Sequence, residues 1–158
     1  MLTKINQRGF TLVEIMIVVA VIGLLAAIVI PNLIRAKITA NEGAMKADLK
    51  AFVSASENFR MAQNPPRYAV NIAALTGANP RYLDRSWGVN PKHGFNITYT
   101  VAAAPANTYS VRVVPRTARI TAVNTYCIDQ RGTVVGSING VGAPTGAATG
   151  CTGGTQIA

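Results

Sequence analysis

The stretch that decides the fold occupies residues 9–34 and has the sequence GFTLVEIMIVVAVIGLLAAIVIPNLI. From residue 10 to residue 34 it contains a single charged residue, Glu14. A helix over these residues extends about 37 Å at about 1.5 Å per residue. Because the hydrocarbon core of a bilayer requires about 20 apolar residues, the sequence predicts a helix that can cross a membrane.

Glu14 is the exception within this apolar segment. An ionisable group inside a membrane costs a few kcal/mol, so it indicates a function and a partner. The alternative is that Glu14, only about 6 Å from Phe10 along the helix axis, extends its carboxylate to the lipid headgroups. The residues by themselves leave both interpretations open.

The run RGFTLVE at residues 8–14 resembles the cleavage and methylation motif of type IV prepilins and of their pseudopilin relatives. The resemblance continues through residue 34 and covers about a fifth of the chain. It implies that a membrane peptidase cuts after Gly9, removes residues 1–9 as a leader and methylates the new amino terminus at Phe10. Glycine suits the cleavage position because it has no Cβ to obstruct the backbone.

The resemblance also implies how the segment works in a filament. The Glu14 carboxylate would pair with the cationic amino terminus of a neighbouring subunit, since each charge is costly when it is left alone in an apolar medium. Gly23 and Pro31 stand at the places where helices of this family weaken or melt on assembly. An ordinary kink is the alternative, because proline removes a helical hydrogen bond and both residues are common in membrane helices.

Two other kinds of segment compete with this interpretation. A secretory signal peptide is disfavoured because the apolar run from residue 10 to residue 30 is too long and no small-x-small cleavage site follows it. A membrane anchor that is never cleaved is the other alternative interpretation of the segment. Counting lysines and arginines beside the segment would place the carboxyl-terminal side in the cytoplasm, whereas the family resemblance and the two cysteines favour the opposite side.

Beyond the membrane segment, residues 35–62 are predicted to continue as an amphipathic helix. Met45, Leu49, Phe52 and Val53 recur at helical spacing on one face. Residues 64–66, Asn-Pro-Pro, end the helix because the position before a proline disfavours helical backbone.

A connecting loop is predicted over residues 63–93, with a short helical turn at residues 72–75. Alternating apolar residues then predict strands at 94–101, 108–114, 122–128 and 133–138. The fold class is therefore α+β: a long amino-terminal helix, half membrane-spanning and half amphipathic, packed on a small antiparallel β-meander in a type IV pilin-like arrangement.

Cys127 and Cys151 are the only cysteines. A disulfide between them would close a 25-residue loop in a glycine-rich tail, a stabilisation of roughly 3.5 kcal/mol in the chain-entropy model. Disulfides persist in oxidising compartments. Two unrelated thiols are the alternative, and the resemblance supports the bond because many pilins close a carboxyl-terminal loop in this way.

The chain is strongly basic, with a formal net charge of +9. Arg112, Arg116 and Arg119 form a cluster near a predicted turn, which makes them candidates for binding DNA or another anionic surface. A solvated basic surface without a ligand is the simpler alternative.

An enzymatic function is not predicted. The one histidine, His93, follows Pro91 and Lys92 in a predicted turn. No metal-ligand spacing or phosphate-binding loop is present in the sequence, and the cysteines do not form a CxxC pair. We therefore expect no catalytic residues, no metal and no cofactor.

The prediction is a structural subunit of a type IV pilus. Its parts are a leader (1–9), a transmembrane and filament-core helix (10–34) and a globular head (35–158), whose sheet and disulfide-closed region begin at residue 94. Its partners are copies of itself, the prepilin peptidase and the assembly machinery. It would lie in the bacterial inner membrane and then in an extracellular filament serving adhesion or twitching motility. The alternatives are a periplasmic pseudopilin of type II secretion and a minor pilin that binds DNA for uptake.

Overall fold

The structure is a computed structural model that describes residues 9–157. Residues 1–8, and with them most of the predicted leader, lie outside the described residues. The chain divides into two compact units, Met1–Ala36 and Lys37–Ala158. Helix α1, Leu12–Met61, contributes its first turns to one unit and its remaining turns to the other.

Helix α1 is continuous and contains Pro31. It ends shortly before the Asn-Pro-Pro run at residues 64–66, as the sequence predicted. In the second unit Met45, Leu49 and Phe52 are fully buried, which confirms the predicted apolar face. Val53 packs against the edge of the same core.

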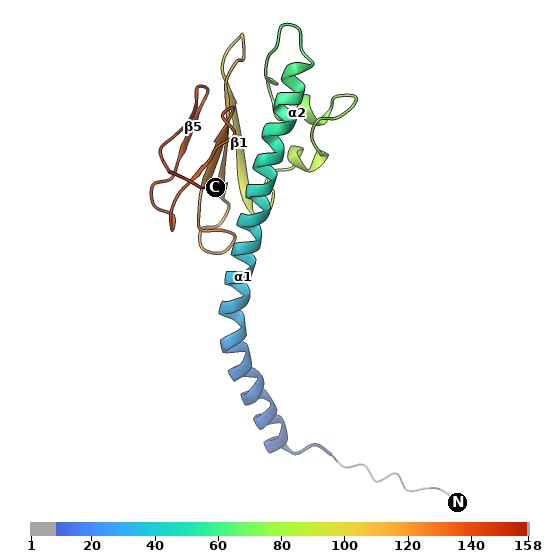
Figure 1. Cartoon of the computed structure of the whole chain (residues 1–158). Coiled ribbons are helices and arrows are strands. Elements are labelled where there is room, and N and C mark those ends of the chain that lie inside the picture. Colours follow the sequence, from blue (N-terminus) through green and yellow to red (C-terminus); the bar gives the residue numbers. More distant parts are fainter. Residues whose placement is uncertain (1–8, 158) are drawn as a thin grey trace, which may run out of the picture. The chain divides into compact units, whose positions relative to one another are not determined.

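After α1 come two short helices and seven strands (Figure 1). The helices are α2, Ile72–Thr76, and the 3-10 helix η1, Arg85–Gly88. The strands are β1 (Phe95–Val101), β2 (Tyr109–Pro115), β3 (Tyr126–Asp129), β4 (Val134–Gly136), β5 (Thr145–Ala147), β6 (Gly150–Thr152) and β7 (Thr155–Gln156). The α+β class and the short turn at α2 are confirmed.

The main sheet has the order β1-β2-β3-β4-β7, and every neighbouring pair is antiparallel. The register of β1 and β2 pairs Ile97 with Val113 and Val101 with Tyr109. The predicted meander is therefore confirmed, although β3 and β4 are shorter than the alternating runs that predicted them. The sequence did not predict β7, which extends the sheet at its edge.

The core lies between the sheet and the second half of α1. The Phe52 ring lies 4.9 Å from that of Trp87 and 5.9 Å from that of Tyr109, measured between ring centroids. Tyr68 meets Tyr109 edge-on at 4.7 Å. These contacts hold the connecting loop against the core, because Tyr68 and Trp87 are both buried.

A β5–β6 hairpin covers the other face of the sheet, opposite α1 (Figure 1). A Cβ added at Gly146 of β5 would lie 2.9 Å from the Ser110 hydroxyl and 3.2 Å from Cβ of Arg112. Glycine is therefore required for this close approach. The β5–β6 part of the glycine-rich tail therefore forms a third layer of the head.

Candidate functional site

The first feature with functional meaning is the apolar part of α1. Every large apolar side chain between residues 12 and 34 is at least 41% exposed. Helix α1 is long and apolar enough to cross a membrane, by length and composition. So large an apolar surface is not stable in water and requires lipid or other helices around it.

The predicted cleavage position is open. Phe10 is 77% exposed, and nothing lies within 4 Å of where a Cβ would stand on Gly9. Both residues precede the first turn of α1, where the backbone is not helical. An exposed backbone outside a helix is a form that a peptidase can bind.

Glu14 caps the start of α1. Its backbone N–H donates to the Thr11 hydroxyl at 3.2 Å, and its Oε2 accepts from the Thr11 hydroxyl and from the Thr11 backbone N–H at 3.2 and 3.3 Å. This reciprocal arrangement is a capping box, which satisfies donors that a helix start leaves free. The sequence prediction missed this local role, although the T-x-x-E spacing was there to indicate it.

Gly23 and Pro31 both lie inside the continuous helix. The Asn32 side-chain amide donates to the carbonyl of Ile28 at 3.1 Å, beside the position where Pro31 has no N–H to give. The predicted melting concerns subunits assembled in a filament, so it stays a prediction.

In the head, a disulfide joins Cys127 of β3 to Cys151 of β6. Asp129, which is buried, accepts hydrogen bonds from the backbone N–H groups of Cys151 and Arg131 at 3.1 and 2.9 Å. The bond and the carboxylate together fix the β5–β6 hairpin to the sheet.

The three predicted anion-binding arginines have different surroundings. Arg112 lies within β2, and its Nε donates to the carbonyl of Pro144 at 2.8 Å, so this side chain holds the tail in place. Arg116 and Arg119 are exposed after the end of β2. Arg119 lines a shallow hollow, formed mainly by uncharged residues, to which neither Arg112 nor Arg116 contributes. A shared ligand for the three stays a prediction.

Glu42 is an anchor that the sequence prediction did not identify. Its Oε1 accepts from the backbone N–H groups of Val123 and Asn124 at 2.8 and 3.0 Å, and its Oε2 accepts from the Tyr126 hydroxyl at 2.8 Å. Neighbouring Asn41 donates to the carbonyl of Thr121 at 2.8 Å. These two side chains tie α1 to the loop between β2 and β3.

The same contacts set the ionisation of Glu42. Partial burial is the largest single influence and acts to raise the pKa, but the hydrogen bonds from Asn124, Val123 and Tyr126 together lower the pKa below its ordinary value. Burial first, and then the bond to Glu42, raises the pKa of Tyr126. Glu42 is therefore a carboxylate at neutral pH that gives up stabilising bonds when it is protonated.

A second polar group links α1 to the connecting loop. The Asp48 carboxylate lies 2.7 Å from Nζ of Lys92 and 3.0 Å from Nε2 of His93. Lys92 also lies over the Trp87 ring, 4.6 Å from its centroid. His93 is thus a structural partner of Asp48, and across residues 9–157 no three His, Cys, Asp or Glu side chains gather as metal ligands would.

Comparison with known proteins agrees with this architecture. The family model described as the prokaryotic N-terminal methylation motif matches residues 4–30. The type IV wide pilus major component PilA4 of Thermus thermophilus is 36% identical over 104 residues, which are 66% of this chain and 70% of that protein. No solved structure shows a significant match.

Two further relatives match over shorter lengths. The type IV major pilin protein PilA of Myxococcus xanthus is 50% identical over 54 residues, 34% of this chain and 24% of that pilin. The type II secretion system core protein G of Klebsiella michiganensis is 41% identical over 56 residues, 35% of this chain and 39% of that protein.

A single long helix with an exposed apolar first half, continued into an α+β head, defines a pilin-like protein. The chain belongs to the type IV pilin family, whose pseudopilin relatives it also resembles. These relatives are structural subunits, so the chain is not an enzyme.

Proposed function

We propose that this protein is the structural subunit of a type IV pilus, a helical polymer of identical chains. The observation that carries the proposal is the apolar surface along residues 12–34 of α1, which no part of the described chain covers. Lipid can cover it before assembly, and the same segments of neighbouring subunits can cover it afterwards. Because the segment passes from one apolar environment to another, close packing and polar contacts between neighbouring helices favour polymerisation.

Processing precedes assembly in this proposal. A prepilin peptidase in the membrane cuts between Gly9 and Phe10, removing the leader (1–9), and Phe10 is then methylated at its new amino terminus. The exposed, non-helical backbone at these residues supports cleavage at this bond. The remaining chain has a membrane and filament-core segment (10–34) and a head (35–158).

Glu14 sets the register between subunits in this scheme. Cleavage gives each chain a cationic terminus at Phe10, four residues before the carboxylate. A terminus from a neighbouring subunit can neutralise Glu14 in the apolar filament core, where an unpaired charge is costly. Gly23 and Pro31 give the segment between them the freedom to unwind as subunits pack.

The precursor lies in the inner membrane with its head outside the cytoplasm, consistent with the disulfide, and the mature subunit lies in a surface filament.

A pseudopilin of type II secretion is the second candidate. It is favoured by the 41% identity to a core protein G, which is confined to about a third of this chain.

The test is intact-mass and amino-terminal analysis of protein sheared from the cell surface. A chain that begins at N-methylated Phe10 and is abundant in long surface fibres is the expected result. Processed chain found only in the membrane fraction would favour the pseudopilin. A chain that keeps residues 1–9 in cells with an active peptidase would overturn the processing scheme.

A further inference from the structure

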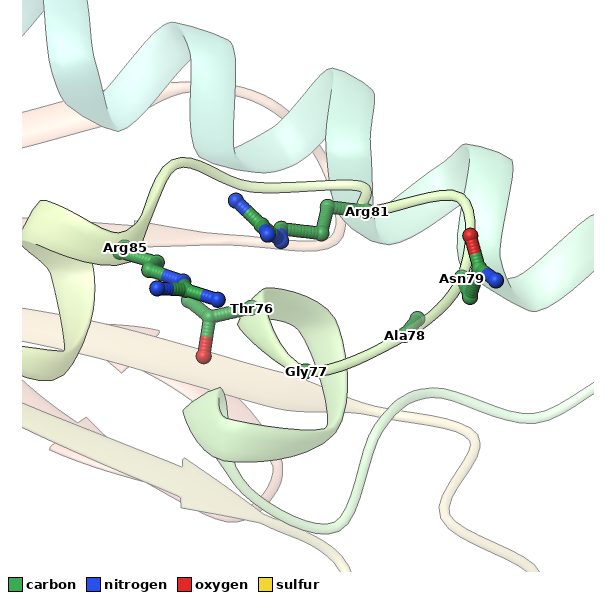
Figure 2. Close-up of a pocket in the computed structure, with 6 residues that line it drawn as sticks. All are labelled: Thr76, Gly77, Ala78, Asn79, Arg81 and Arg85. Atoms are coloured by element: carbon green, nitrogen blue, oxygen red, sulfur yellow. The ribbon is translucent and has the colours of Figure 1, made fainter.

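A hollow in the head brings two arginines together beside α2 and η1 (Figure 2). Its volume is about 650 Å³, and it is lined by Thr76, Gly77, Ala78, Asn79, Arg81 and Arg85. Figure 2 shows the side chains of Arg81 and Arg85 extending toward one another across the hollow. The lining has no acidic and no aromatic residue.

The backbone that carries Arg81 is fixed from the core. Leu75 is fully buried, and its carbonyl accepts from the backbone N–H groups of Tyr82 and Leu83 at 3.1 and 3.3 Å. These two bonds close the loop that contains residues 76–81. Leu83 is also buried, so both ends of the loop are held by the core.

The backbone that carries Arg85 is also fixed by its surroundings. It opens η1, where the Asp84 carboxylate accepts from the backbone N–H of Ser86 at 2.7 Å. Two residues further on, Trp87 is buried against Phe52. Both guanidinium groups therefore extend from backbone that is ordered before any ligand arrives, which reduces the entropy lost on binding.

The two positive charges are not neutralised within the head. In the described part of the chain, no ion pair includes Arg81 or Arg85. The neighbouring carboxylate of Asp84 accepts the capping bond of η1 and forms no ion pair with either arginine, and that of Asp48 is paired with Lys92 and His93. An oxyanion between the arginines would relieve their repulsion and accept paired, charge-assisted hydrogen bonds from the planar groups.

The lining narrows the class of ligand. Single-stranded nucleic acid is bound through aromatic side chains on which bases stack. The aromatic residues nearest the hollow in sequence pack within the head instead: Trp87 against Phe52, and Tyr82 against Phe59. The Thr76 hydroxyl donates to the carbonyls of Ile72 and Ala73. The hollow offers guanidinium groups, the Asn79 amide and loop backbone. These groups suit an anion that also carries hydroxyl groups, bound in a hollow that is open to solvent.

We propose that this hollow binds an acidic sugar unit of a polysaccharide, with its carboxylate or phosphate held between Arg81 and Arg85. The site lies wholly within the head and does not depend on polymerisation. It is separate from Arg112, Arg116 and Arg119, none of which lines it. The protein would thereby recognise an acidic matrix or surface glycan.

The experiment measures binding to the full chain in a nonionic detergent at physiological salt. The probes are a galacturonate hexamer and a phosphorylated mannose oligosaccharide, which separate the two sources of oxyanion, with neutral dextran and single-stranded DNA as comparisons. Binding of either acidic oligosaccharide, and none of dextran, is expected. R81Q/R85Q should weaken it by about tenfold or more, since two charge-assisted contacts are lost.

Two further variants make the result specific. R116Q/R119Q removes the same charge elsewhere on the head and should change the affinity less than about twofold, as expected for screened distant charges. R81K/R85K keeps the charge but loses the planar fork, and should weaken binding by about threefold or more. Circular dichroism of each variant checks that the head remains folded.

Several results would overturn the proposal. Equal losses from R81Q/R85Q and R116Q/R119Q would show attraction to the net charge and not a site. DNA binding as tight as that of the acidic sugars, lost in R81Q/R85Q, would make the ligand a nucleic acid. Full retention of sugar binding by a folded R81Q/R85Q variant would exclude the hollow. None of these outcomes bears on whether the chain polymerises.

Discussion

Thr11 and Glu14 cap the amino-terminal end of α1 reciprocally, each accepting a hydrogen bond from the other. The same carboxylate is the proposed partner of a neighbouring subunit's amino terminus. One residue therefore has two roles that substitutions can separate, since only the second requires the negative charge.

Glu14→Gln should reduce the filament yield by about tenfold or more, because it keeps a capping side chain but removes the charge that a buried terminus needs. Thr11→Ala removes the cap and keeps the carboxylate, so it should leave most of the yield. The measurement is the ratio of sheared to membrane-bound protein in cells. If Thr11→Ala were as harmful as Glu14→Gln, helix capping would explain the effect.

Glu14→Val should still insert in the membrane, because it removes the only charge in the segment, yet it should assemble poorly. Membrane fractionation and fibre counting check the two halves of this prediction. A normal fibre yield from this variant would contradict the role proposed for the carboxylate.

Glu42→Gln should lower the free energy of unfolding of the head by about 1–2 kcal/mol at pH 7, because bonds to a charged, partly exposed acceptor are weakened. The pKa of Glu42 is lower in the folded chain than its ordinary value of 4.5. The contribution of Glu42 to the stability of the head is therefore complete at pH values above 4.5. It is lost as the pH falls through the pKa that Glu42 has in the folded chain.

The measurement for Glu42 is denaturant unfolding of the chain in detergent at pH 7 and at pH 3. The difference between the wild type and Glu42→Gln should shrink at the lower pH. Tyr126→Phe removes one of the bonds to the same carboxylate and should show a smaller loss at pH 7. If the difference in unfolding free energy between the wild type and Glu42→Gln were the same at both pH values, the stabilising role of the Glu42 charge would be contradicted.

Cys127→Ala with Cys151→Ala should lower the free energy of unfolding by roughly 3.5 kcal/mol, the chain-entropy value for a 25-residue loop. The β5–β6 hairpin should then become sensitive to protease while the β1-β2-β3 part resists. Limited proteolysis with mass spectrometry measures this. Equal resistance of the hairpin in both proteins would mean that Asp129 and Arg112 suffice to hold it.

Gly146→Ala should destabilise the head by about 1–3 kcal/mol, because the added methyl meets Ser110, Arg112 and Cys127 within 2.9–3.5 Å. Gly88→Ala is the matched control, since its added methyl has open space around it. Thermal unfolding of the two variants should therefore differ. Equal melting temperatures would show that the hairpin can move away from the sheet at little cost.

The sequence by itself determined the elements that depend on local pattern. The apolar run at residues 10–34 predicted the membrane helix, the spacing of Met45, Leu49 and Phe52 predicted the buried face, and alternating residues predicted the meander. Each signal is a periodicity that the backbone geometry of a helix or a strand imposes on the sequence.

Only the tertiary structure decided the contacts between residues far apart in the chain. Glu42 reaches Asn124 and Tyr126, and Arg81 and Arg85 share a hollow that no other arginine lines. The glycine-rich tail forms a covering layer through β5 and β6 and adds β7 to the edge of the main sheet. The physical reason is that such contacts depend on how the elements pack, which no local spacing in the sequence encodes.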